Sequence, residues 1–322
     1  MNGWIIFDKP VGLGSTQAVG AVKRVCREAG LGKVKVGHGG TLDPLASGVL
    51  PIALGEATKL CGRMLDASKV YDFTVRFGTE TAGLDAEGEV VATSDVRPTI
   101  AEVEAVLPRF TGPIEQVPPA FSAIKIDGQR AYDLARKGEA VEMKARAVTV
   151  YALSPLPFGG GVGGGGSRSE AAFTDGPHPN PSPEGEGLDE ITLTAHVSKG
   201  TYIRSLARDI AHAVGSVGHV TMLRRTRAGP FDLAQAISLD KLNAFGQGAA
   251  QSEIILPLEA GLVDIPALNL SPEAAGAIRQ GRVWAGVATD DGLYWGRDSD
   301  MRPVALIEAL AGTLKVVRGF NL

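Results

Sequence analysis

Residues 155–190 form a segment that cannot contribute to a folded core, and it separates two ordered parts of the chain. The segment holds 10 Gly and 6 Pro, with six acidic side chains against the single basic Arg168. Such a composition is typical of flexible linkers, so we expect a flexible insertion. Its net charge is −5 and that of the whole chain is −4, which leaves +1 for all other residues. The acidity of the chain is therefore largely a property of this segment.

The residues on either side of the insertion alternate between apolar and polar side chains. The period of two that is typical of strands occurs in RAVTVYAL (146–153) and EITLTAHV (190–197), and we expect the two to pair in one sheet. The same period in VYDFTVRF (70–77) puts Tyr71 on the face of Phe73. Because the strands lie outside the insertion, we expect the fold to survive its deletion.

Helical signals occur between these strands. We expect a buried strand at 4–7, followed by a helix that begins after an N-cap at Ser15 or Thr16 and buries Val19, Val22, Cys26 and Ala29. A second helix should follow the capping box of Thr99 and Glu102. Two more are expected at 200–215, ending at Gly215, and at 271–281. Strands and helices mix without a regular βαβ repeat. This favours an α+β fold with a mixed sheet over a doubly wound nucleotide-binding fold.

Length and composition narrow the class of protein. The chain has 322 residues, 44% of them apolar, which predicts one large domain and a smaller one, the latter a β-rich domain at 255–322. No apolar run approaches the roughly 18 residues of a membrane helix, and we expect a cytoplasmic protein. The two cysteines, Cys26 and Cys61, are too few and too far apart for a disulfide scaffold or a CxxC pair.

The segment at 35–60 has the composition of a site loop. Gly37, Gly39 and Gly40 permit backbone conformations that other residues avoid, and Pro44 keeps Asp43 out of the helical region. Asp43 therefore lies at a corner before an apolar stretch, where a carboxylate can face a cleft. The alternative, which the local pattern alone favours, is that Asp43 caps an Asx turn or a helix.

Other motifs give weaker signals. KPVGLGST, at 9–16, follows a strand and precedes a helix as a phosphate loop would, but the chain has neither a GxxxxGK[ST] nor a full GxGxxG motif there. The five histidines show neither HExxH nor HxxxH spacing. A metal site therefore has little support, and a capped helix start explains the 9–16 segment better than a phosphate loop does.

Positive charge concentrates in two stretches. Residues 199–227 carry six basic side chains against Asp209 alone, and residues 1–70 carry nine against five acids. Phosphate contacts would explain this, although such runs are more often solvated faces. Tyr202 and Arg204 at a helix start, with Tyr71 on a strand, suit single-stranded RNA and ordinary packing equally well.

Five collinear blocks together resemble one known family. They are GWIIFDKPVGLGST (3–16), GHGGTLDPLASGVLP (37–51), KVYDFTVRFGTET (69–81), QVPPAFSAIKIDGQRAYDLARKG (116–138) and SKGTYIRSLARDIAHAVGSVGHVTMLRRTRAG (198–229). The chain resembles the TruB-type family of tRNA pseudouridine-55 synthases over about residues 3–245, apart from the insertion.

The resemblance implies a fold and a reaction. It implies an α+β catalytic domain at 1–245 built on a mixed sheet, a linker at 246–254, and a PUA-like RNA-binding domain at 255–322. A uridine in the T-arm loop of tRNA would be flipped out and isomerised to pseudouridine without metal or cofactor. We expect a monomer that acts on tRNA.

The resemblance also implies roles for seven residues. Asp43 would be the nucleophile, Arg204 would pair with it and keep it ionised, and Tyr71 would stack on the uracil and relay a proton. The residues implied to support the site or hold the nucleotide are Lys9, His38, Tyr202 and Leu223.

One position departs from the pattern of the family. Ala82 stands where the family commonly has an acidic residue, while Asp85 keeps its place, with a structural role favoured over an RNA-facing one.

An inactive RNA-binding or tRNA-folding protein could use the same surface, but it would not need a carboxylate facing phosphates. A kinase using the 9–16 loop lacks the Walker lysine pattern and magnesium carboxylates.

Overall fold

A computed structural model describes most of the chain as two compact units. It describes residues 1–122, 124–126, 129–131, 134, 143–156, 187–247, 250 and 254–322. The first unit combines residues 1–67 with 227–322, and the second spans 68–226. Most of the insertion expected at 155–190 lies outside the described residues. Within the described part, no helix has the length and apolarity to cross a membrane.

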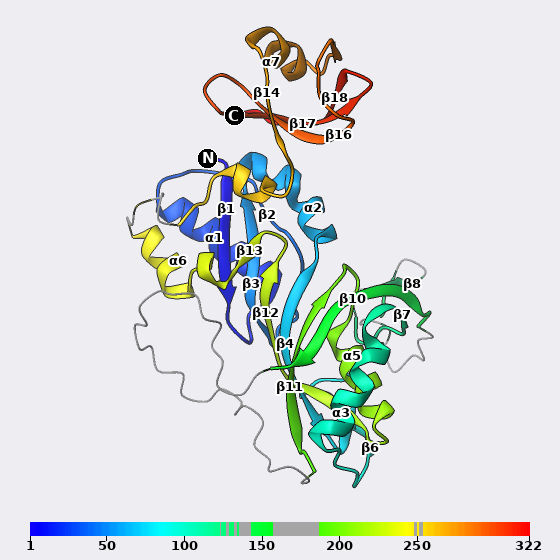
Figure 1. The fold of residues 1–322 in the computed structure, drawn as a ribbon. Coiled ribbons are helices and arrows are strands. Elements are labelled where there is room, and N and C mark those ends of the chain that lie inside the picture. The colour runs from blue at the N-terminus through cyan, green and yellow to red at the C-terminus, as the bar shows by residue number, and fades with distance from the viewer. Residues whose placement is uncertain are drawn as a thin grey trace. The chain divides into compact units, whose positions relative to one another are not determined.

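The N-terminal part of the first unit is built on three antiparallel strands (Figure 1). The central strand β3 (Ala46–Leu54) pairs with β1 (Gly3–Lys9) and with β2 (Val36–His38). Nearly every residue of β1 and β3 is buried, which matches their long apolar runs. Two helices, α1 (Ser15–Glu28) and α6 (Leu239–Gly246), pack against each other in the same unit.

The C-terminal part of the first unit is a separate five-stranded sheet. Its strands, in the order β14-β16-β17-β18-β15, are β14 (Ala267–Asn269), β16 (Gly292–Arg297), β17 (Pro303–Leu310), β18 (Thr313–Gly319) and β15 (Trp284–Ala285). Helix α7 (Pro272–Arg279) covers a small apolar core beside it. A second core joins Leu306 and Phe320 of this part to Trp4 of β1. Burial of these side chains ties the C-terminal sheet to the N-terminal strands.

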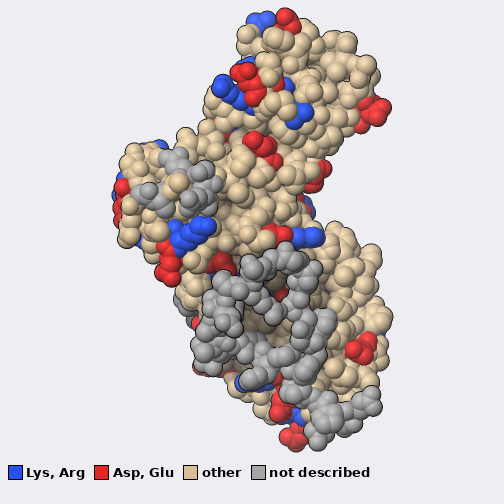
Figure 2. All heavy atoms as spheres, turned by 60° about the vertical axis from the view of Figure 1, so that its left-hand side comes forward, with Lys and Arg blue, Asp and Glu red and all other residues tan. Residues whose placement is uncertain are grey.

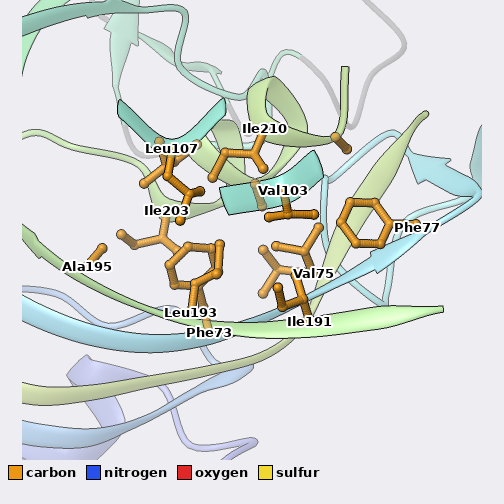
Figure 3. Close-up of a cluster of buried hydrophobic side chains, with 14 of the residues drawn as sticks. Phe73, Val75, Phe77, Val103, Leu107, Ile191, Leu193, Ala195, Ile203 and Ile210 are labelled. Carbon is orange, nitrogen blue, oxygen red and sulfur yellow. The ribbon is translucent and has the colours of Figure 1, made fainter. Parts of the chain in front are cut away.

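The strands of the second unit include an antiparallel run in the order β4-β11-β10-β7. The strands are β4 (Lys69–Phe77), β11 (Glu190–Val197), β10 (Arg146–Pro155) and β7 (Gly112–Gln116). Two helices, α3 (Ile100–Val106) and α5 (Ile203–Ala213), pack apolar side chains into its core. Phe73 of β4 and Leu193 of β11 lie beside Ile203 of α5 there (Figure 3).

The remaining helices and strands complete the two units. They are the 3-10 helices η1 (Gly55–Leu60), η2 (Leu107–Phe110), η3 (Leu233–Gln235) and η5 (Leu258–Leu262), helix α2 (Cys61–Asp66), and the strands β5 (Thr79–Thr81), β6 (Val90–Thr93), β8 (Lys125–Ile126), β9 (Gln129–Arg130), β12 (Gly218–Ala228) and β13 (Phe231–Asp232).

The α+β class expected from the sequence is confirmed. The alternating segments on both sides of the insertion pair as β10 and β11, and the capping box of Thr99 and Glu102 begins α3. The helix expected at 200–215 is α5, and Gly215 follows it at a φ of 77°.

One expected helix start is wrong. The N-cap of α1 is Gly14, which has no side chain to cap the helix, and the side chain of Gln17 accepts the Gly14 amide. Ser15 is the first residue of the helix and turns its hydroxyl to Leu42 instead. Val19, expected in the core, is only half-buried. The local sequence could not reveal the distant partner that draws Ser15 away from the cap.

Candidate active site

Asp43 lies on a turn that leads directly into β3. The amide of Ala46, the first residue of the strand, donates to the Asp43 carbonyl at 3.0 Å. The carbonyl of the next residue, Pro44, accepts the amide of Gly12 at 2.8 Å. A strand, and not a helix, follows, so the alternative of a helix cap at Asp43 is excluded. The backbone on both sides of the carboxylate is thus held by hydrogen bonds.

Lys9 secures the same turn from β1. Its side chain is fully buried, and its ammonium donates to the carbonyls of Leu13 at 2.7 Å, Pro10 at 2.9 Å and Pro44 at 3.3 Å. A buried ammonium requires such acceptors, because its charge has left water. The lysine therefore joins the loop after β1 to the turn that carries the candidate nucleophile.

The glycines of the 35–60 segment serve two different purposes. Gly40, Gly48 and Gly55, at φ of 139°, 101° and 57°, use backbone conformations that other residues avoid, whereas Gly37 and Gly39 do not. A Cβ on Gly39 would stand 2.5 Å from the Cβ of Met64, so close packing excludes a side chain there. At Gly37 the nearest atom would be the sulfur of Cys61, at 3.3 Å. The expectation of special backbone angles at Gly37 and Gly39 is therefore wrong. His38, on β2, accepts the amide of Gly40 at Nδ1, 3.3 Å away.

In the second unit, Arg204 lies in the first turn of α5 and its side chain is buried. The residue is 8% exposed, and its guanidinium donates to the Asp85 carboxylate at 3.0 Å. It also donates to the carbonyls of Gly83 at 2.7 Å and Phe121 at 3.0 Å. The structural interpretation of Asp85 is supported, since its carboxylate is the counter-charge of a buried arginine.

Tyr202, the N-cap residue of α5, is fixed through its backbone. The buried side chain of Gln116 accepts the Tyr202 amide at 2.8 Å and donates to the Tyr202 carbonyl at 3.1 Å. One amide thus satisfies both backbone groups at the start of the helix that carries Arg204. Two further candidates, Tyr71 on β4 and Leu223 on β12, are partly buried against the core of the second unit.

Burial also changes the acidity of several groups near these elements. It raises the pKa of the Asp209 carboxyl on α5, although Arg208 beside it acts in the opposite direction. Burial raises the pKa of both thiols, Cys26 and Cys61. A raised thiol pKa disfavours the thiolate, so neither cysteine has the character of an activated nucleophile.

The basic run at 199–227 does not form a uniform cationic face. Arg204 and Arg225 are buried, the latter with 1% exposure, whereas Lys199 and Arg227 are exposed. On the face in Figure 2, basic and acidic side chains are interspersed among uncharged ones. Counting charges along this run therefore overestimates the positive surface available to phosphates.

The predicted site residues fall into two groups, one in each unit. Lys9, His38 and Asp43 belong to the first unit, and Tyr71, Tyr202, Arg204 and Leu223 belong to the second. The expected pairing of Arg204 with Asp43 joins the two units and stays a prediction. Sequence reasoning missed Gln116 and the hydrogen bond of Ser15, because neither partner is close in sequence.

Each unit offers side chains that can take part in catalysis. The first unit offers a carboxylate on an anchored turn, and the second offers a buried guanidinium and a tyrosine. Such groups can perform nucleophilic and proton-transfer chemistry. Among the described residues, no three His, Cys, Asp or Glu side chains gather as metal ligands.

Two family models match the chain. That of the TruB family pseudouridylate synthase N-terminal domain matches residues 27–161, and that of the tRNA pseudouridylate synthase B C-terminal domain matches 204–263. The second match ends before the five-stranded sheet that begins at Ala267.

Chains in two solved complexes have a similar fold. A chain from an H/ACA RNP bound to a substrate RNA containing 2'-deoxyuridine superposes with a TM-score of 0.68 at 24% identity, covering 99% of this chain and 85% of its own. A chain from a Cbf5-Nop10-Gar1 complex gives a TM-score of 0.66 at 26% identity, covering 99% and 84%. At such low identity the likeness shows the fold alone.

Curated relatives match the chain from end to end. The protein named tRNA pseudouridine synthase B of Novosphingobium aromaticivorans is 62% identical over 322 residues, which cover 100% of this chain and 98% of the relative. That of Zymomonas mobilis is 53% identical over 321 residues, covering 100% and 96%. With this identity over its whole length and both family domains matched, the chain belongs to the TruB family of tRNA pseudouridylate synthases and is an isomerase.

Proposed function

We propose that this enzyme converts uridine 55 in the T-arm loop of tRNA to pseudouridine, with Asp43 as the nucleophile. The observation that carries the proposal is the 62% identity, over the whole chain, to a protein named tRNA pseudouridine synthase B. The anchored turn at Asp43 supports the assignment of the nucleophile, because covalent catalysis needs a carboxylate held in one place.

The reaction rearranges bonds within one nucleotide. The enzyme flips the uridine out of the loop, and Asp43 attacks either the anomeric carbon of the ribose or carbon 6 of the base. The bond from nitrogen 1 to the ribose breaks, the uracil turns, and carbon 5 bonds to the ribose in its place. Carbon 5 loses a proton and nitrogen 1 gains one. Because no atom or electron is gained overall, side chains can carry out every step.

The other candidate residues receive supporting roles in this proposal. Arg204 provides the positive charge that keeps the nucleophile ionised, and Tyr71 stacks on the uracil and relays the proton from carbon 5. His38 helps to hold the opened T-loop, Tyr202 packs against the target nucleotide, and Leu223 lines the base pocket.

Lys9 is assigned to support of the site from within. Its ammonium is fully buried against three backbone carbonyls, and this supports a positioning role in place of a contact with phosphate.

Four further properties belong to the same proposal. We place the boundary of the catalytic domain near residue 245 and assign residues 255–322 to a PUA-like RNA-binding domain. We also propose a monomer that acts in the cytoplasm. Sedimentation of the enzyme, alone and with tRNA, measures whether it is a monomer.

Mapping of pseudouridine tests the substrate position. The purified enzyme is incubated with an unmodified tRNA transcript, without added cofactor, and pseudouridine is located at single-nucleotide resolution. A transcript with cytidine at position 55 is the matched control. We expect modification at position 55 of the first transcript and none in the second. Pseudouridine at another position would contradict the proposed site, and tRNA binding without product would favour an RNA-binding protein.

A further inference from the structure

Ser15 makes an unusual pair of hydrogen bonds next to the candidate nucleophile. Its hydroxyl donates to the carbonyl of Leu42 at 2.9 Å and accepts the amide of the same residue at 2.8 Å. Both residues are buried, at 5% and 3% exposure. A single side chain therefore satisfies both backbone groups of the residue that directly precedes Asp43.

This hydroxyl has no role in capping its own helix. Gly14 is the N-cap of α1, and the side chain of Gln17 reaches back to the Gly14 amide at 2.7 Å. A serine at a helix start usually accepts a hydrogen bond from its own helix, whereas the Ser15 hydroxyl bonds to a turn 27 residues away in sequence. The contact therefore acts on the Asp43 turn and leaves the start of α1 to other groups.

The turn is held on its other side as well. Pro44, directly after Asp43, has its carbonyl bound by the Gly12 amide and by Lys9. The residues before and after Asp43 are thus both fixed to the segment at 9–15. With its two neighbours anchored, the Asp43 backbone has little freedom to rotate, which limits the positions its carboxylate can reach.

We propose that Ser15 is a positioning residue for the Asp43 nucleophile and acts through its two hydrogen bonds to Leu42. The inference rests on the proposed function, in which Asp43 attacks the flipped uridine. Without the hydroxyl, two buried backbone groups lose their partner, and the turn shifts to find another. The carboxylate shifts with the turn, so the rate of the chemical step falls while the surface that binds tRNA is preserved.

The test compares Ser15→Ala with Thr16→Ala, a control at an exposed hydroxyl one residue away. The single-turnover rate constant and the Kd for tRNA are measured for each variant. We expect Ser15→Ala to lower the rate about 10- to 100-fold, as a misplaced reacting group does. The Kd should stay near that of the unchanged enzyme, and Thr16→Ala should match the enzyme in both quantities. Ser15→Thr keeps the hydroxyl and should restore most of the rate.

The outcomes separate this inference from the proposed function. If Ser15→Ala does not fold, Ser15→Cys replaces it, since a thiol fills the same space but is a weak donor. The inference would be overturned if Ser15→Ala or Ser15→Cys reacted as fast as Thr16→Ala, or if the substitution weakened tRNA binding but left the rate unchanged. A folded Ser15→Thr that reacts as slowly as Ser15→Ala would overturn it as well. Asp43→Asn is assayed in parallel. If Asp43→Asn remained active, the proposed function would fail; if it is inactive while Ser15→Ala keeps full rate, only the inference fails.

Discussion

Replacing Asp85 with asparagine would remove a carboxylate that pairs with the buried Arg204. The Arg204 side chain is 9% exposed and that of Asp85 is 19% exposed, and their nearest atoms are 3.0 Å apart. Two unit charges about 4 Å apart interact by about 4 kcal/mol at an effective dielectric constant of about 20. Removing one partner of a fully buried pair costs about 3–5 kcal/mol.

Two features of the structure reduce this figure. Asp85 is partly exposed, and the Gly83 and Phe121 carbonyls still accept from the guanidinium in the variant. Asparagine also keeps an oxygen acceptor in place of the carboxylate. We therefore expect Asp85→Asn to lower the free energy of unfolding by about 2–4 kcal/mol. The loss should be local to the second unit, because both residues belong to it.

Denaturant unfolding together with hydrogen exchange of the α5 amides measures this loss. Glu190→Gln is the matched control, because Glu190 pairs with Arg76 at 3.3 Å but the two side chains are 32% and 55% exposed. Such an exposed pair contributes at most about 1 kcal/mol. Equal losses for the two variants, or unchanged exchange of the α5 amides in Asp85→Asn, would refute the reasoning from burial.

Three further changes give distinct results. Gly39→Ala should lower stability by about 1–3 kcal/mol, because its Cβ would overlap Met64; an unchanged Tm in thermal unfolding would contradict this. Gln116→Met keeps the side-chain volume but removes the acceptor of the Tyr202 amide, while the Tyr202 carbonyl still accepts the Leu206 amide. Denaturant unfolding should show a loss of about 1–2 kcal/mol, and no loss would show that another group replaces the Gln116 side chain. Deleting residues 157–186, between β10 and β11, should keep pseudouridine formation within a few-fold; a large loss would show that the insertion takes part.

Much of the fold follows from local patterns in the sequence. Strand β4 was predictable because apolar and polar residues alternate, and Phe73 and Val75 both point into the core. Helix α3 was predictable because Thr99 and Glu102 form a capping box whose partners are three residues apart. These signals are reliable because the interactions that produce them connect near neighbours.

The contacts that shape the site connect distant parts of the chain. Arg204 and Asp85 are separated by 119 residues, and Ser15 and Leu42 by 27. The composition of one segment does not identify such partners, and Ser15 therefore resembled a helix cap. The burial of Arg225 was hidden for the same reason, because a count of charges does not report how the tertiary fold covers them.

The identities of the candidate residues came from a different kind of signal. The local pattern around Asp43 favoured a turn-capping role, and only the five collinear blocks assigned a nucleophile to it. The structure adds the hydrogen bonds that hold the turn, which no pattern in the sequence indicated. Family resemblance thus supplied the proposed roles, and the structure supplied the physical support for them.

Comparison of the enzyme with its Asp43→Asn variant tests the central claim most directly. Both proteins are given the same unmodified tRNA transcript, and bound tRNA and pseudouridine at position 55 are measured in the same samples. Asparagine keeps the size of the side chain but lacks the nucleophilic carboxylate, so we expect unchanged binding and no pseudouridine. Pseudouridine formed by Asp43→Asn at a rate close to that of the unchanged enzyme would contradict the assignment of Asp43 as the nucleophile.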